Sequence, residues 1–191
     1  MLQKTLQRKG IEESLDTLLA YTGKTSESIF KDLIKKHNIN QTLEEFKEDH
    51  RKGGSFYADS PDLEPMPGIV EFLEKMKDLG IPMGIVSSTR SKSVVIALNR
   101  INLLKYFDIV VCGDMVENHK PSPDGYLLAL KFLQGKPEES LVIEDTRIGI
   151  QAGKSAGMKV IGFKGSVFRQ DSSNADIEVE SYRELMDQME F

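Results

Sequence analysis

Residues 141–153 read LVIEDTRIGIQAG and decide the fold class of this chain. The apolar run Leu141–Ile143 has the length of a buried strand, Glu144 and Asp145 follow it directly, and a helical pattern begins near Arg147. Short apolar strands that alternate with helices predict a parallel sheet covered on both faces. Ligands of such sheets bind outside the carboxyl ends of the strands, so the two acids are candidate functional residues.

The same alternation of strands and helices extends over the last two-thirds of the chain. The pattern predicts helices between, and after, short strands at 83–86, 109–112, 141–143, 160–163 and 177–179. Residues 1–62 show helical spacing without a convincing strand, and Thr42 with Glu45 forms a capping box. The sequence therefore predicts a small all-helical domain over 1–62 and an α/β core over 63–191.

Composition narrows the function classes. The 191 residues are 39% hydrophobic and 29% charged, which is typical of a globular protein. A net charge of -5 argues against a nucleic-acid-binding surface. We find no apolar run of the roughly 18 residues needed to cross a bilayer, and no signal-peptide h-region near the start. The single cysteine, Cys112, lies in an apolar run, so we expect a buried thiol. One cysteine cannot form an internal disulfide, which fits a cytoplasmic protein. From the charge and the missing apolar run we expect no nucleic-acid and no membrane partner.

Hydroxyl groups follow the predicted strand 83–86. Ser87, Ser88 and Thr89 stand between this strand and a helix, where hydroxyls and successive backbone N–H groups form an anion cradle, and Arg90 adds positive charge. These four residues are candidate phosphate ligands. The alternative is that the hydroxyls merely cap the next helix.

A lysine lies between two other motifs. Lys120 follows the predicted strand 109–112 and a loop, and Pro121 and Pro123 stiffen the backbone around it. We expect Lys120 to bind phosphate, although a surface lysine before a helix is the alternative. Asp124 is open to either a functional or a helix-capping interpretation.

The acidic pair Glu144 and Asp145 indicates a metal site. Adjacent carboxylates repel each other unless a cation lies beside them. Mg²⁺ needs only one or two protein carboxylates, because water and phosphate oxygens complete its coordination. The alternative is a pair of acids favoured by a helix N-terminus.

In their order and in their residues, these segments resemble the sequence motifs of the haloacid dehalogenase (HAD) superfamily of phosphohydrolases and phosphomutases. The resemblance is to its β-phosphoglucomutase and phosphoglycolate phosphatase-like branch. The resemblance implies a Rossmann-like parallel core with a helical cap. It further implies that Ser87 binds the transferring phosphoryl group, that Lys120 neutralises the phosphate and the nucleophile, and that Glu144 and Asp145 hold Mg²⁺.

The cap matches that branch more loosely. Residues 21–25 correspond to a loop that faces the substrate, so Lys24 is a candidate ligand, or else a solvated surface lysine. Ser26 stands where β-phosphoglucomutases carry a sugar-phosphate-binding arginine, which weakens a mutase assignment.

One part of the family pattern is absent from the sequence. The resemblance implies an Asp-x-Asp strand, between the strands that end at Ser87 and Asp145, whose first aspartate attacks phosphorus. The 191 residues contain no Asp-x-Asp. We expect a sequence that begins too late, and two unpaired strand edges unless the sheet closes up, another segment fills the gap or a second chain donates a strand.

The resulting hypothesis is a Mg²⁺-dependent phosphatase of a small phosphorylated metabolite that works through an aspartyl-phosphate and is inactive in this version. The alternatives are a nonenzymatic protein that binds phosphate or a partner, and a β-phosphoglucomutase-like phosphomutase. The oligomeric state is not readable from the sequence.

Overall fold

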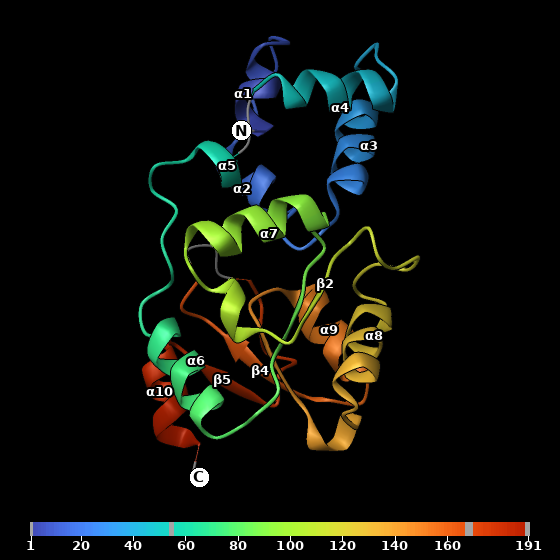
Figure 1. The fold of residues 1–191 in the computed structure, drawn as a ribbon. Helices are drawn as coiled ribbons and strands as arrows, with labels where there is room; N and C mark the ends of the chain where they lie inside the picture. The colour runs from blue at the N-terminus through green and yellow to red at the C-terminus, as the bar shows by residue number, and fades with distance from the viewer. Residues whose placement is uncertain (1, 54–55, 167–169, 190–191) are drawn as a thin grey trace.

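The computed structural model describes residues 2–53, 56–166 and 170–189. Five helices at one end of the molecule form the cap (Figure 1). They are α1 (Leu2–Gln7), α2 (Leu15–Leu19), α3 (Ser26–Lys36), α4 (Leu43–Arg51) and α5 (Phe56–Asp59).

The cap has an apolar core of its own. Leu6, Phe30, Leu33 and Phe46 bury their side chains together, and α4 begins with the predicted capping box between Thr42 and Glu45. This separate cluster supports treating the helical part as a unit, while the exact boundary between 62 and 63 stays a prediction. Met1, Gly54 and Ser55 of the predicted domain lie outside the described residues.

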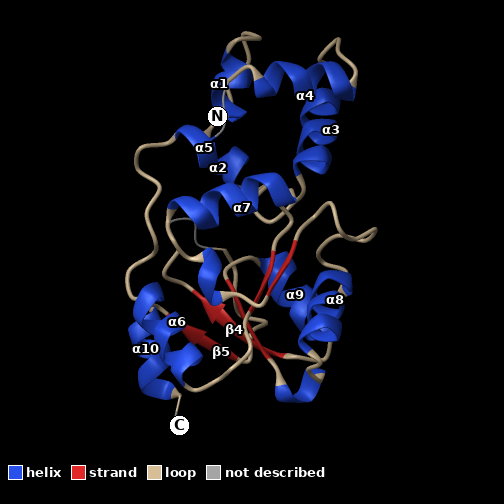
Figure 2. Ribbon diagram, viewed as in Figure 1, coloured by secondary structure: helices blue, strands red, loops and turns tan. Residues whose placement is uncertain are grey.

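The remaining elements form the α/β core, as predicted (Figure 2). Its strands are β1 (Gly84–Val86), β2 (Ile109–Val111), β3 (Leu141–Glu144), β4 (Lys159–Phe163) and β5 (Ile177–Val179). Its helices are α6 (Ile69–Asp78), α7 (Ser91–Arg100), α8 (Asp124–Leu133), α9 (Arg147–Ser155) and α10 (Tyr182–Gln188), with 3₁₀ turns η1 (Leu104–Tyr106) and η2 (Pro137–Glu139).

The strands make two parallel sheets rather than one. β1 pairs with β2, while β3, β4 and β5 pair in that order, and among the described residues no strand joins β1 to β3. In a parallel ladder, successive residues of a strand point their backbone N–H and C=O groups alternately to one side and the other, so the hydrogen bonds show which residues face the neighbouring sheet. Ser87 N donates to Val111 O, so in this register the backbone groups of Gly84 and Val86 point away from β2. Val160 O accepts from Asp176 N on the β5 side of β4, so the backbone groups of Ile143 point away from β4. We call the space between these two edges the β1–β3 slot.

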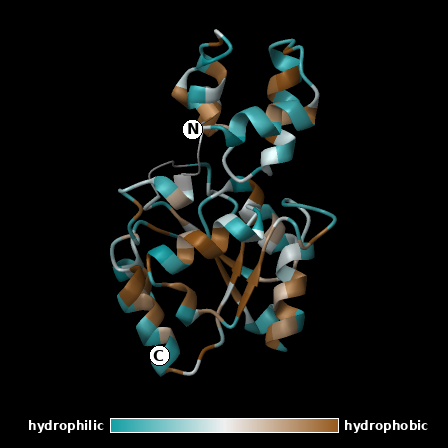
Figure 3. Ribbon diagram, turned by 45° about the horizontal axis from the view of Figure 1, so that its top comes forward, coloured by the Kyte–Doolittle hydropathy of each residue, from teal (hydrophilic) through white to brown (hydrophobic). Residues whose placement is uncertain are grey.

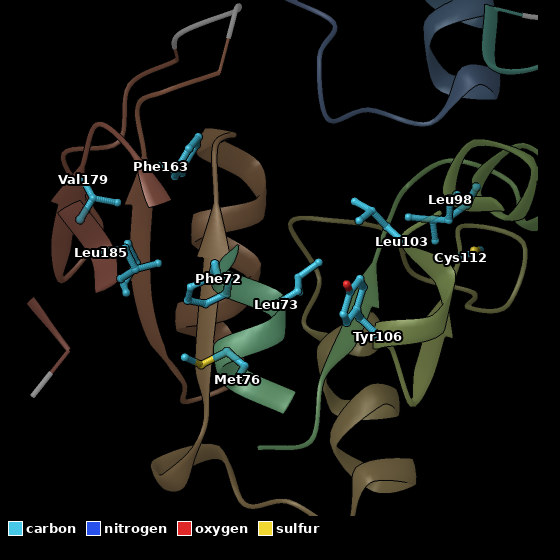
Figure 4. Packing of buried hydrophobic residues seen from close by; sticks show 12 residues of the cluster. Phe72, Leu73, Met76, Leu98, Leu103, Tyr106, Cys112, Phe163, Val179 and Leu185 are labelled. Carbon is cyan, nitrogen blue, oxygen red and sulfur yellow. The ribbon is translucent and has the colours of Figure 1, made fainter. Parts of the chain in front are cut away.

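One apolar cluster nevertheless spans both sheets. Figure 4 shows Phe72 and Met76 of α6 between Val179 and Leu185 on one side and Tyr106 on the other. Apolar residues concentrate in the strands, whereas the helices alternate between apolar and polar positions (Figure 3). Burial of this surface holds the two sheets in one core.

Within the described part of the chain, no helix has both the length and the apolar character that crossing a membrane requires.

Candidate phosphate and metal site

A buried ion pair stands at the carboxyl end of the β1–β3 slot. Lys120 Nζ contacts Glu144 Oε1 and donates to Val86 O at 3.0 Å, and both charged side chains are 9% exposed. Lys120 Nζ also lies 4.9 Å from the centre of the Tyr126 ring. One ammonium group therefore contacts the ends of both sheets.

Glu144 is fully engaged. Its Oε1 accepts from Tyr126 Oη at 3.0 Å, and its Oε2 accepts from the backbone N–H groups of Asp145 and Thr146 at 3.0 Å and from Thr146 Oγ1 at 2.9 Å. Burial opposes ionisation, but the Lys120 charge and these hydrogen bonds outweigh it and lower the pKa of Glu144. Glu144 thus organises the first turn of α9, and its oxygens would have to exchange partners to bind a metal directly.

Glycine at position 149 makes this arrangement possible. A Cβ there would lie 2.1 Å from the Glu144 carboxylate. The Glu144 carboxylate therefore rests directly against the backbone of α9.

Asp145 has the opposite electrostatic environment. Burial, and then the charge of Glu144, raise the pKa of Asp145, while a hydrogen bond from Ser166 opposes the rise. A half-buried carboxylate that lacks full compensation fits one side of a Mg²⁺ site, because a cation would stabilise its charged form. Among the described residues, however, no group of three or more His, Cys, Asp or Glu is placed to hold a metal.

The hydroxyl segment lies at the end of β1, but it does not cap α7 with a hydroxyl. Ser87 Oγ accepts from Thr89 N at 3.1 Å, and since the hydroxyl proton of Ser87 has no acceptor among the described residues, it is available to donate to a ligand. The N-cap of α7 is Arg90, whose side chain makes no capping bond. The helix-capping alternative for Ser87–Thr89 is therefore wrong, while their assignment as phosphate ligands stays a prediction.

A small cavity of ≈ 10 Å³ lies beside this segment, large enough for about one water molecule. Ser87, Ser88 and Lys120 line it together with Gly113 and Cys112, which is buried as predicted. A Cβ at Gly113 would lie 2.3 Å from Ser88 O, so the loop after β2 holds the hydroxyl segment by direct backbone contact.

Two predicted ligands lie outside this cluster. Lys24 is exposed in the cap, where its Nζ pairs with Asp32 at 3.3 Å and lies 5.1 Å from the Tyr21 ring centre. Arg90 is exposed at the start of α7. Their assignment as substrate ligands stays a prediction that would require their side chains to move.

Sequence reasoning missed three residues that shape the site. Tyr126 and Thr146 hold Glu144, and Asp114 accepts from Ser91 N at 2.8 Å at the start of α7, an interaction that lowers the pKa of Asp114. Thr146 could have been found from its position as the N-cap of α9. Tyr126 and Asp114 carry no such local signal.

Fold and site together define a parallel α/β protein with a helical cap and a hydroxyl–lysine–carboxylate edge. The family model for haloacid dehalogenase-like hydrolases matches residues 1–163, and the chain belongs to this family. The predicted family and fold are thereby confirmed.

Several relatives are phosphatases by name. The chain is 38% identical over 130 residues to the phosphorylated carbohydrates phosphatase of Thermotoga maritima, covering 68% of this chain and 59% of that protein. It is 32% identical over 159 residues to the phosphoglycolate phosphatase of Aquifex aeolicus, covering 83% and 72%. In fold it is similar to β-phosphoglucomutase from Clostridium difficile, with a TM-score of 0.82, 24% identity and coverage of 96% and 83%.

Proposed function

We propose that the function of this protein is the Mg²⁺-dependent hydrolysis of a small phosphorylated metabolite through an aspartyl-phosphate. The observation that carries the proposal is Lys120, whose ammonium group contacts the ends of both sheets beside Ser87 and the acidic pair. A dianionic phosphate at this point would meet a lysine, hydroxyl and backbone donors. The names of the phosphatase relatives support the substrate class.

The proposed roles follow from the contacts. Ser87 donates its hydroxyl proton to a phosphoryl oxygen while its Oγ keeps the bond from Thr89 N, and the N–H group of Ser88 adds a donor. Lys120 neutralises phosphate charge once its bond to Val86 O is exchanged for one to the phosphate. Asp145 would bind Mg²⁺ directly, and Glu144 would position Asp145 through its bond from the Asp145 N–H. Bound Mg²⁺ would supply charge neutralisation of the phosphoryl oxygens.

Asp145, the aspartate of this chain that follows a strand at the β1–β3 slot, is assigned to the metal. We therefore infer that the attacking aspartate would lie on a strand between β1 and β3. The chain by itself should therefore be inactive. Covalent catalysis on aspartate requires the carboxylate in line with phosphorus, and a strand between β1 and β3 would end beside Lys120.

The test compares three proteins in an aryl phosphate hydrolysis assay with Mg²⁺. The first is this chain, the second carries an added N-terminal apolar strand ending in Asp-x-Asp, and the third carries the same strand with Asn-x-Asn. We expect turnover and an acid-stable phosphoenzyme from the second alone, and a loss of at least about 100-fold when it also carries Lys120→Met.

Two outcomes would contradict the proposal. Turnover by the chain alone would place the nucleophile elsewhere. A folded extended chain that binds phosphate without turnover would favour the nonenzymatic phosphate-binding alternative.

A further inference from the structure

The cap touches the core next to the acidic pair through backbone rather than through charged side chains. Gly23, with φ +91°, lies against the first turn of α9: a Cβ there would be 3.0 Å from Ile148 Cγ1 and 3.2 Å from Thr146 Cβ. A larger residue at 23 would crowd Ile148 and Thr146 and would be strained at this positive φ. Lys24 itself stays paired with Asp32 inside the cap.

One side chain joins this loop to the core by two hydrogen bonds. Gln170 Oε1 accepts from Arg147 N at 3.1 Å, and Gln170 Nε2 donates to Thr22 O at 3.2 Å. Arg147 N belongs to the first turn of α9, whose N–H groups have no partner within the helix. A carboxamide carries both an acceptor and a donor, so it can satisfy the helix end and the cap loop at once.

A second cap–core contact differs in strength and in place. Arg100, at the end of α7, donates to Tyr57 O at 2.8 Å and Ser60 O at 2.7 Å, on the segment that leads out of the cap. These bonds are short and carry a charged donor, whereas the bonds of Gln170 are longer and neutral. Because the linker bonds have a charged donor, we expect the loop contact beside Asp145 to open before the linker contact does.

We propose that Gln170 is a positioning residue that holds the cap loop Tyr21–Lys24 over the acidic end of α9. With both bonds made, the loop covers the part of the site that faces the body of a substrate. With them broken, the loop moves away while Arg100 retains the linker. The contact itself is independent of the proposed phosphatase activity, whereas its effect on substrate binding rests on that function.

The first experiment measures amide hydrogen exchange. Gln170→Ala should speed exchange in the peptide spanning 21–24 by about 10-fold or more and leave α3 unchanged, because a loop contact opens locally. Gln170→Glu keeps an acceptor for Arg147 N but has no donor for Thr22 O, so it should free the cap loop and leave the start of α9 protected. Gln151→Ala, which removes a surface bond to Ser155 on the same helix, is the matched control and should change neither region.

The second experiment separates positioning from general damage to the site. Calorimetry with inorganic phosphate and with a hexose phosphate should give an unchanged phosphate affinity in Gln170→Ala and a hexose phosphate affinity lower by about 10-fold, since phosphate contacts the core alone. Equal losses for both ligands, or unchanged exchange at 21–24, would overturn the positioning role. If the wild-type chain binds neither ligand, the phosphatase proposal fails while the exchange result still decides the role of Gln170.

Discussion

The two sheets of the core differ in chemistry and in burial. The β1–β2 sheet ends in uncharged donors, and its strand β1 is only half-buried, with Gly84 exposed. The β3–β5 sheet ends in carboxylates, and its central strand β4 is buried from Val160 to Phe163. The proposed phosphate donors thus stand on one sheet and the proposed metal ligands on the other, with Lys120 in contact with both. Strand β1 and strand β3 are both only partly buried where the two sheets face each other.

The largest effect should come from breaking the Lys120–Glu144 pair. Lys120→Met leaves Glu144 buried with its charge uncompensated, and we expect a loss of about 3–5 kcal/mol in urea unfolding. The double variant Lys120→Met/Glu144→Gln removes both charges and should recover most of that loss. A single variant as stable as wild type would mean that Lys120 does not join the two sheets.

Alanine at two glycines should disturb one sheet each. Gly149→Ala clashes with the Glu144 carboxylate, and Gly113→Ala clashes with Ser88 O, so each should cost about 1–3 kcal/mol. Hydrogen exchange should then rise around β3 in the first and around β1 in the second. Gly135→Ala is the control, because its Cβ would meet only the flexible ends of Leu130 and Ser140 at 3.2 and 3.4 Å. Identical exchange patterns in both variants would show that the sheets respond as one.

At Asp145 we expect a smaller effect, and a gain of folding stability on substitution instead of a loss. Its folded-state pKa lies above the ordinary value of 3.8, so the folded state holds an extra proton and stability falls as pH rises through that window. In metal-free buffer at pH 7, Asp145→Asn should therefore raise Tm by a few degrees, and the difference should vanish at a pH below the ordinary value. Mg²⁺ should then stabilise the wild type and leave the variant unchanged. A lower Tm for Asp145→Asn at pH 7 would contradict the claim that the surroundings of Asp145 raise its pKa.

The sequence predicted the fold and the candidate residues of the core because each signal is local. Ser87, Lys120 and Glu144 stand at strand ends or beside prolines, where strand direction alone brings them to one edge. The absence of an Asp-x-Asp segment also predicted unpaired strand edges. The described strands form two separate sheets, and whether their facing edges are unpaired stays a prediction.

What the sequence could not give are contacts made across the fold. Tyr126 reads as an apolar position of α8, and its bond to Glu144 depends on how α8 packs beside β3. Gln170 lies 148 positions from Thr22 in a polar loop without pattern. The same limit applies to Lys24, whose pairing with Asp32 arises from the packing of the cap.

The most direct test of the central claim is amide exchange measured residue by residue at low protein concentration. Val86 and Ile143 face the β1–β3 slot, whereas Ile85 and Glu144, their neighbours on the same strands, face β2 and β4. We predict that the amides of Val86 and Ile143 exchange on the order of 100-fold faster than those of Ile85 and Glu144. Equal protection of all four amides would mean that the two edges are paired, and would contradict an open slot in this chain.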